Sequence, residues 1–164
     1  MVTLADRKIG TNFLIYIVNL RQSVPQRIEG LQRGIQQDYN AYCIYMNSRC
    51  KMFKDRGWKI NISNEQLPDQ TEDRFQIHPK FEWDNYYGKR KFVPADELRQ
   101  YQKIIVCGVF LKEDVLSQFM NLKKINPETY IAPTLSFTTK FGYDNFKVDK
   151  NYHNQITISD YIYV

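Results

Sequence analysis

Unbroken runs of apolar residues mark the strands that we expect to lie inside the protein. The clearest run covers residues 103–109 and passes through Gly108 into a short turn. A strand covered on both faces is continuously apolar, whereas a half-exposed strand alternates, so this run predicts a buried strand of a parallel sheet. A second apolar run at residues 12–19 predicts another buried strand of the same kind.

Apolar residues at helical spacing follow both runs. Val115, Phe119 and Leu122 recur at intervals of four and three, which predicts a helix that ends near residue 124. Residues 24–35 show the same periodicity and predict a helix that ends near residue 38, and the apolar run 41–46 then predicts a second strand. Strand, helix and strand in this order indicate a βαβ unit with parallel strands.

Shorter patterns complete the predicted layout. They are an edge strand at 58–62, a strand at 74–78, a helix at 94–101, a strand at 129–133 that Pro133 stops, and an alternating last strand at 155–164. We therefore expect a single α/β domain over residues 1–164, with a three-layer sandwich, a mainly parallel sheet and an added C-terminal edge strand.

Composition places the protein among globular chains, with 43% hydrophobic and 25% charged residues. No run approaches the roughly 18 apolar residues of a membrane span, and the first residues lack the order of a signal peptide. We expect a cytoplasmic protein without a membrane partner, in the host cytoplasm if the Tyr-, Asn- and Lys-rich composition reflects a phage or viral genome.

An odd number of cysteines argues against a disulfide framework. We expect Cys43 and Cys107 in the core and Cys50 at the surface.

A formal net charge of +5 is compatible with an anionic partner. One loop combines aromatic with basic side chains: Trp83, Tyr86, Tyr87, Lys89 and Arg90. Such a loop suits stacking on a nucleobase, a protein interface, or packing on the domain itself. Of the partners, a nucleic acid is the less favoured, and a homo-oligomer stays open.

Candidate chemistry is expected where the buried strands end. In open α/β sheets ligands bind outside the carboxyl ends of the strands, which directs attention to residues 110–114 and, within them, to Phe110, Glu113 and Asp114. Neither histidine, His78 or His153, has the spacing of a metal ligand pair, and no phosphate loop or dinucleotide fingerprint occurs. We predict no cofactor and no metal; a cation held by scattered carboxylates is the less favoured alternative.

Four segments match, in order, the layout of a known family. They are a first strand at 13–19, a strand ending in a lysine at 75–80, the segment Phe-Glu-Trp-Asp-Asn at 81–85, and an apolar strand with a Gly-Val pair at 104–109. Over about residues 12–140 this layout resembles the isochorismatase-like cysteine hydrolases, the group that includes nicotinamidases and carbamoyl amidohydrolases. The resemblance implies an acidic base after the first strand, a lysine, and a nucleophilic cysteine six residues after the glycine.

The resemblance places these three roles on Asn19, Lys80 and Asp114, and two of them change chemically. An amide cannot take a proton from a thiol, and a carboxylate stands where the thiol is expected. The resemblance then implies a catalytically altered or inactive member that binds a small molecule or a protein. One alternative is a hydrolase on a small or nucleotide substrate that uses Asp114 and Lys80 for acid–base chemistry or anchoring. The other is a nucleic-acid-binding protein that uses the basic, Tyr-rich loop.

Overall fold

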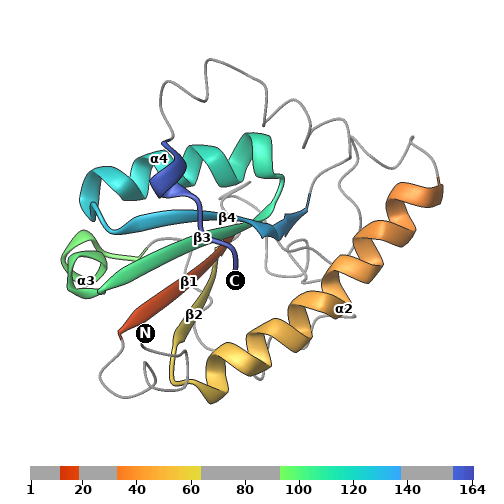
Figure 1. Ribbon diagram of the computed structural model, residues 1–164, viewed down its shortest axis with the longest axis horizontal. Coiled ribbons are helices and arrows are strands. Elements are labelled where there is room, and N and C mark those ends of the chain that lie inside the picture. The colour runs from red at the N-terminus through yellow and green to blue at the C-terminus, as the bar shows by residue number, and fades with distance from the viewer. Residues whose placement is uncertain (1–11, 19–32, 64–92, 138–156) are drawn as a thin grey trace, which may run out of the picture.

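The computed structural model describes residues 12–18, 33–63, 93–137 and 157–164 (Figure 1). Four parallel strands form one sheet in the order β2-β1-β3-β4. Their bounds are β1, Phe13–Val18; β2, Lys59–Ser63; β3, Lys103–Val109; and β4, Thr129–Phe137. The helices are α2, Arg33–Asp55; α3, Ala95–Gln100; the π-helical turn η4, Leu111–Val115; α4, Leu116–Ile125; and the 3-10 turn η5, Ile158–Asp160.

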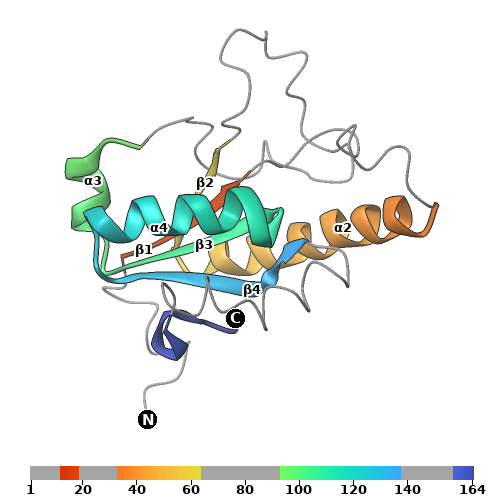
Figure 2. The ribbon, with the colours of Figure 1, turned by 90° about the horizontal axis from the view of Figure 1, so that it is seen from above.

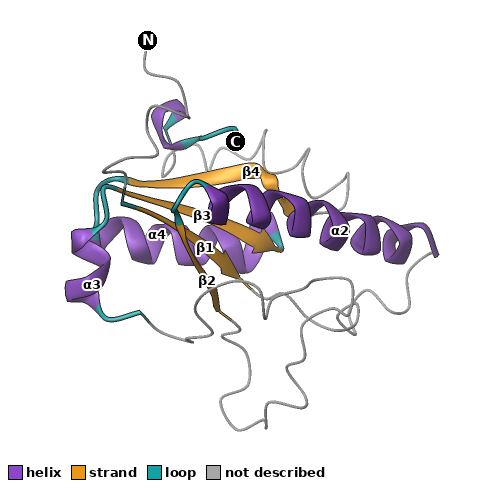
Figure 3. Ribbon diagram, turned by 90° about the horizontal axis from the view of Figure 1, so that it is seen from below, coloured by secondary structure: helices purple, strands orange, loops and turns teal. Residues whose placement is uncertain are grey.

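Helices cover the sheet on both faces. Figure 2 shows α4 in front of the strands, and Figure 3, from the opposite side, shows α2 in front of them. Alternate residues of β1 accordingly enter two cores: Ile15 and Ile17 pack with α2, and Leu14 and Tyr16 pack with α4. This arrangement confirms the predicted three-layer α/β sandwich with a parallel sheet.

The two strands predicted from continuous apolar runs lie side by side at the centre. All six residues of β1 and residues 104–109 of β3 are buried. The two strands pair in register from Phe13 with Lys103 to Val18 with Gly108. The helix predicted after β3 is also present, and it buries Val115, Phe119 and Leu122 as its periodicity requires.

The predicted strand at 41–46 is wrong, because these residues lie within the 23-residue helix α2. That helix continues to Asp55, well past the predicted end near residue 38, and residues 19–32 before it lie outside the described residues. Its buried side chains recur at helical intervals: Tyr39, Tyr42, Cys43, Met46, Cys50 and Phe53. Ile44 is 55% exposed, which no core strand would allow. The second strand of the βαβ unit is instead β2, which pairs parallel to β1.

A glycine ends α2. The amide of Gly57 donates to the Lys54 carbonyl at 2.9 Å, and that of Trp58 donates to the Phe53 carbonyl at 3.0 Å. With φ of +80° at Gly57, these bonds form a Schellman motif. The hydrophobic contact that accompanies this motif is the stack of Trp58 on Phe53, with ring centroids 5.2 Å apart. The motif turns the chain directly into β2.

Strand β4 continues through Pro133, contrary to the prediction that this proline stops it. Ile131 pairs with Val106 and Ser136 pairs with Gly108, so β4 bulges between them. Proline lacks an amide hydrogen, but in a bulge no ladder bond is required of it. The bulge is tied to α2, since the Tyr42 hydroxyl donates to the Leu135 carbonyl at 2.7 Å.

The last described segment, residues 157–164, lies at the predicted edge of the sheet but is not a full strand. It contains η5 and a single parallel bridge between Tyr161 and Ile131 of β4.

The predicted strand at 74–78 lies outside the described residues. The helix predicted at 94–101 is confirmed as α3. Among the described helices, none is both long enough and apolar enough to cross a membrane.

Candidate functional site

The strand order creates a switch point between β1 and β3. From β1 the chain proceeds to β2 on one side of it and later returns to β3 on the other side. The helix after β1 along the chain, α2, covers one face, and η4 with α4 after β3 covers the other. Connections that diverge in this way leave a crevice at the carboxyl ends of the two strands, where ligands of open α/β sheets bind. In this chain the corresponding position is the edge of the sheet beyond Val18 and Val109.

Close contact of the two strands at this edge depends on Gly108. Its φ is +127°, and a Cβ atom there would lie 2.2 Å from the carbonyl oxygen of Val18 and 2.5 Å from its amide nitrogen. Both obstacles are backbone atoms of the central strand, which cannot move aside without breaking the sheet. Glycine is therefore required at position 108, where the two strands end side by side.

The chain leaves β3 through two buried side chains that point into opposite cores. Phe110, 8% exposed, packs with the α2 core and contacts Phe137, with ring centroids 5.7 Å apart. Leu111 is fully buried in the α4 core. The peptide bond between Val109 and Phe110 is cis. The buried side chains of Phe110 and Leu111 fix the path of the chain into η4.

Asp114 lies in η4, at the carboxyl edge that the switch point defines. The turn is π-helical, with the Val115 amide donating to the Phe110 carbonyl at 3.2 Å. Asp114 is half-buried. Glu113 belongs to the same turn, and its side chain lies outside the described part of the structure. Single π-helical turns occur frequently at functional sites, which fits the position of this one.

The remaining predicted site residues lie outside the described residues: Asn19, Lys80, Trp83, Tyr86, Tyr87, Lys89 and Arg90. Asn19 directly follows the last residue of β1, Val18, and this strand end adjoins that of β3. The convergence of Asn19 and Lys80 on Asp114 stays a prediction.

All three cysteines of the chain lie in the core beneath α2, so the expectation that Cys50 is exposed is wrong. Cys50 lies seven residues after Cys43, two helical turns along the same inward face. Burial raises the pKa of the Cys43 and Cys50 thiols to about 12 and that of Cys107 well above its usual value. At neutral pH these thiols are protonated and unreactive.

Within the described residues, no three side chains of the metal-binding types His, Cys, Asp and Glu are grouped to hold a metal ion. Neither histidine of the chain falls within those residues.

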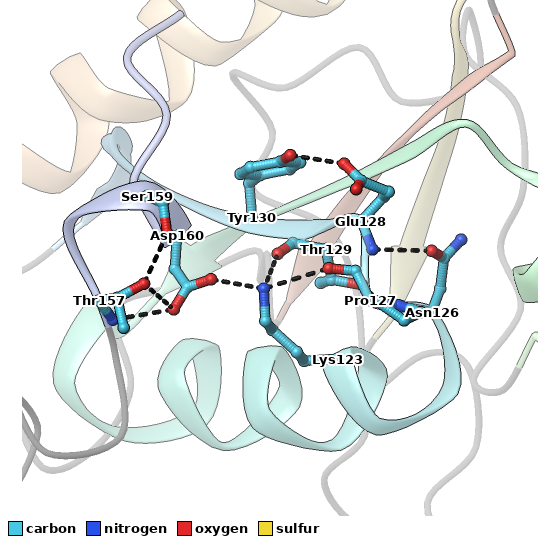
Figure 4. A network of polar contacts seen from close by, with 9 residues as sticks. All are labelled: Lys123, Asn126, Pro127, Glu128, Thr129, Tyr130, Thr157, Ser159 and Asp160. Atoms are coloured by element: carbon cyan, nitrogen blue, oxygen red, sulfur yellow. Dashed lines mark hydrogen bonds and ion pairs between the residues drawn. The ribbon is translucent and has the colours of Figure 1, made fainter.

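Sequence reasoning missed a polar cluster on the far edge of the sheet (Figure 4). Lys123 on α4 forms an ion pair with Asp160 and also donates to the carbonyls of Pro127 at 3.1 Å and Thr129 at 3.3 Å. The other carboxylate oxygen of Asp160 accepts from the amide and hydroxyl of Thr157, at 2.8 and 3.0 Å. The only signal in the sequence is an acidic residue within a segment that otherwise alternates apolar and uncharged polar residues.

The Asp160 carboxylate is buried yet ionised. Burial by itself raises the pKa of a carboxyl group, because the charged form loses hydration. Hydrogen bonds from Lys123 and Thr157, together with the positive charge of Lys123, outweigh that effect and hold the pKa of Asp160 below its ordinary value. The ionised form therefore stabilises the fold.

Comparison of the chain with protein-family models, with curated proteins and with solved structures finds no match.

Proposed function

We propose that the chain is a catalytically altered or inactive isochorismatase-like protein that acts as a binding module for a small molecule or a protein. The site would be the crevice between the carboxyl ends of β1 and β3. Its support is positional: Asp114 follows Gly108 by six residues and lies in the first turn after β3, where the resembling family carries its nucleophilic cysteine.

The observation that carries the proposal is the location of the thiols. Cysteine hydrolysis requires a thiolate at the carboxyl edge, next to a base and a cation. All three cysteines of this chain are instead buried beneath α2, with pKa values raised by burial. A carboxylate at position 114 can bind an amine or a hydroxyl group, but it supplies no thiol chemistry. Free thiols without a disulfide also support the cytoplasmic location that we propose.

A hydrolase of another kind is the second candidate, and the half-burial of Asp114 is the observation that favours it. A carboxylate that is partly enclosed at a strand end can still reach a bound substrate, as a general base must. In this version Asp114 and Lys80 act on a small or nucleotide substrate. The binding module proposed first would bind its ligand without converting it.

The test restores the thiol by Asp114→Cys and measures its alkylation by iodoacetamide as a function of pH. If Lys80 adjoins position 114, its ammonium group lowers the pKa of the introduced thiol, and Lys80→Ala in the same background should raise that pKa by about one unit. Lys124→Ala is the matched control, because Lys124 is exposed on α4 and should leave the profile unchanged. The three native thiols contribute little background, since they are buried.

Identical alkylation profiles with and without Lys80 would contradict the proposed site. Amidase activity of the unmodified chain that alkylation abolishes would contradict the proposed loss of cysteine chemistry. Hydrolysis that survives alkylation and disappears in Asp114→Ala would instead establish the second candidate.

A further inference from the structure

The outer side of β4 is covered by a short segment that is distant in sequence. Residues 157–164, here termed the edge segment, form one bridge to this strand, Tyr161 with Ile131. One backbone bond accompanies it, from the Ile162 amide to the Ile131 carbonyl at 3.0 Å. Among the described strands none pairs with β4 on this side. Within the described part of the chain, the edge segment is therefore the only cover of this sheet edge.

The edge segment resembles a bound peptide in how it is held. Asp160 inserts a buried carboxylate that pairs with Lys123 of α4. The next residues close the two sides of the edge, with Tyr161 packed on the α4 core and Ile162 and Val164 packed on the α2 core. Sheet edges bind peptides by main-chain hydrogen bonds and by pockets for alternate side chains. The edge segment has one such bond and apolar side chains on both faces, and the pair of Asp160 and Lys123 adds a charged anchor.

Residues 138–156, a stretch of nineteen, connect β4 to the edge segment. Fully extended, nineteen residues span roughly 60–70 Å, far more than the width of one sheet. A connection of that length can reach the same site on a neighbouring molecule as well as on its own.

We propose that the outer edge of β4 and Lys123 form an acceptor site for the edge segment of a second copy of this chain, so that two copies exchange these segments. The second copy is the matching partner because the site already fits this sequence: an acid, an aromatic residue and an aliphatic residue in succession. Exchange of identical elements creates a dimer without requiring any new contact.

The same contacts form within one molecule, and tethering favours that arrangement. The effective concentration of a tethered segment is on the order of mM. Exchange therefore becomes prominent only at comparable protein concentration or when the internal pairing is weakened. A charge exchange between two full-length variants weakens the internal pairing alone.

The experiment mixes a Lys123→Glu chain with an Asp160→Lys chain. Within each variant the side chains at positions 123 and 160 carry charges of the same sign and repel each other, so the internal pairing is weakened. Between the variants both pairs are complementary, since each copy offers the charge that the other requires. We expect each variant alone to be monomeric by light scattering, and an equimolar mixture to form a 1:1 dimer at the same concentration. The two variants should associate with each other at least tenfold more tightly than either associates with itself.

The matched control is Lys124→Glu, which makes the same charge change at an exposed neighbour on α4 and should not dimerise with the Asp160→Lys chain. A mixture that stays monomeric overturns the proposal, as does equal dimerisation of either variant alone. Circular dichroism checks that each variant is folded.

If the Asp160→Lys chain does not fold, a labelled peptide of residues 155–164 with blocked ends replaces it. A version of this peptide with Asp160→Lys should bind the Lys123→Glu chain at least tenfold more tightly than the unmodified peptide does. Equal binding of both peptides, or binding of neither, overturns the proposal.

Discussion

Gly57 and Gly108 both have positive φ, but their surroundings differ. A Cβ atom at Gly57 would meet nothing within 4 Å, whereas at Gly108 it would collide with the backbone of Val18. The first glycine is required by conformation alone, and the second is required by conformation and space together. The pair separates these two effects within one molecule.

We predict that Gly57→Ala lowers the free energy of unfolding by about 1–2 kcal/mol, the strain of a side chain in the left-handed region. Gly108→Ala should cost more than about 3 kcal/mol or prevent folding, because the β1–β3 pairing must open to admit the methyl group. Urea unfolding followed by circular dichroism measures both. Equal losses would contradict the close approach at Gly108.

At the scale of elements, a buried hydrogen bond joins α2 to the β4 bulge. The hydroxyl of Tyr42 donates to the Leu135 carbonyl, and both residues are buried. Three residues further along α2, Tyr45 is exposed, and its hydroxyl accepts from the Arg49 side chain at 2.9 Å. The two tyrosines offer the same chemical change in two environments.

Tyr42→Phe should lower the free energy of unfolding by about 1–3 kcal/mol, because it removes a donor from the buried Leu135 carbonyl. Tyr45→Phe should change it by less than about 0.5 kcal/mol, since water replaces the lost contact. Chemical unfolding of the two variants under the same conditions gives the comparison. A small effect of Tyr42→Phe would mean that water reaches the bulge.

The strands that the sequence predicted most clearly are those whose burial is uniform. In β1 and β3 both faces are covered, so a continuous apolar run has one interpretation. The run 41–46 failed because six apolar residues fit either a buried strand or a helix, and periodicity over so few positions does not separate them. Only the buried positions 39, 50 and 53 outside the run reveal helical spacing. The continuation of β4 through Pro133 depends on a bulge, which local sequence does not encode.

The position of the candidate site was predictable for the same reason. Strand ends follow from strand assignment, and the rule for open sheets then directs attention to residues 110–114. The pair of Lys123 and Asp160 was not predictable, because its partners are 37 positions apart and meet only through the path of the edge segment. Contacts between charges that are distant in sequence depend on the completed fold.

For the whole molecule, the ion pair of Asp160 predicts how stability changes in acid. Its folded-state pKa lies below the ordinary value of 3.8, so the ionised carboxylate stabilises the fold. That contribution is complete well above pH 3.8 and is lost as the pH falls below 3.8 through the folded-state pKa. Acid therefore weakens the attachment of the edge segment.

We expect Asp160→Asn to lower the free energy of unfolding at pH 7 by about 1–3 kcal/mol, the value of a buried hydrogen bond to a charged group. The difference from the unmodified chain should shrink as the pH falls below 4. Asp96→Asn is the control, because the Asp96 carboxylate pairs with Arg99 but its side chain is 95% exposed. A difference that persists unchanged to pH 3 would contradict the role of the ionised form.

The central place of β1 also has a consequence for the order of events during synthesis. This strand pairs with β2 on one side and with β3 on the other, and its neighbour Asn12 bonds to Gln102, 90 positions later. At ribosomal rates that interval corresponds to roughly 5–20 s. In the second half of it, once β2 has been synthesised, β1 and β2 can pair while the opposite edge of β1 has no partner. The nascent chain therefore presents an apolar, unpaired strand edge until β3 leaves the ribosome, and its folding is most exposed to aggregation in that interval.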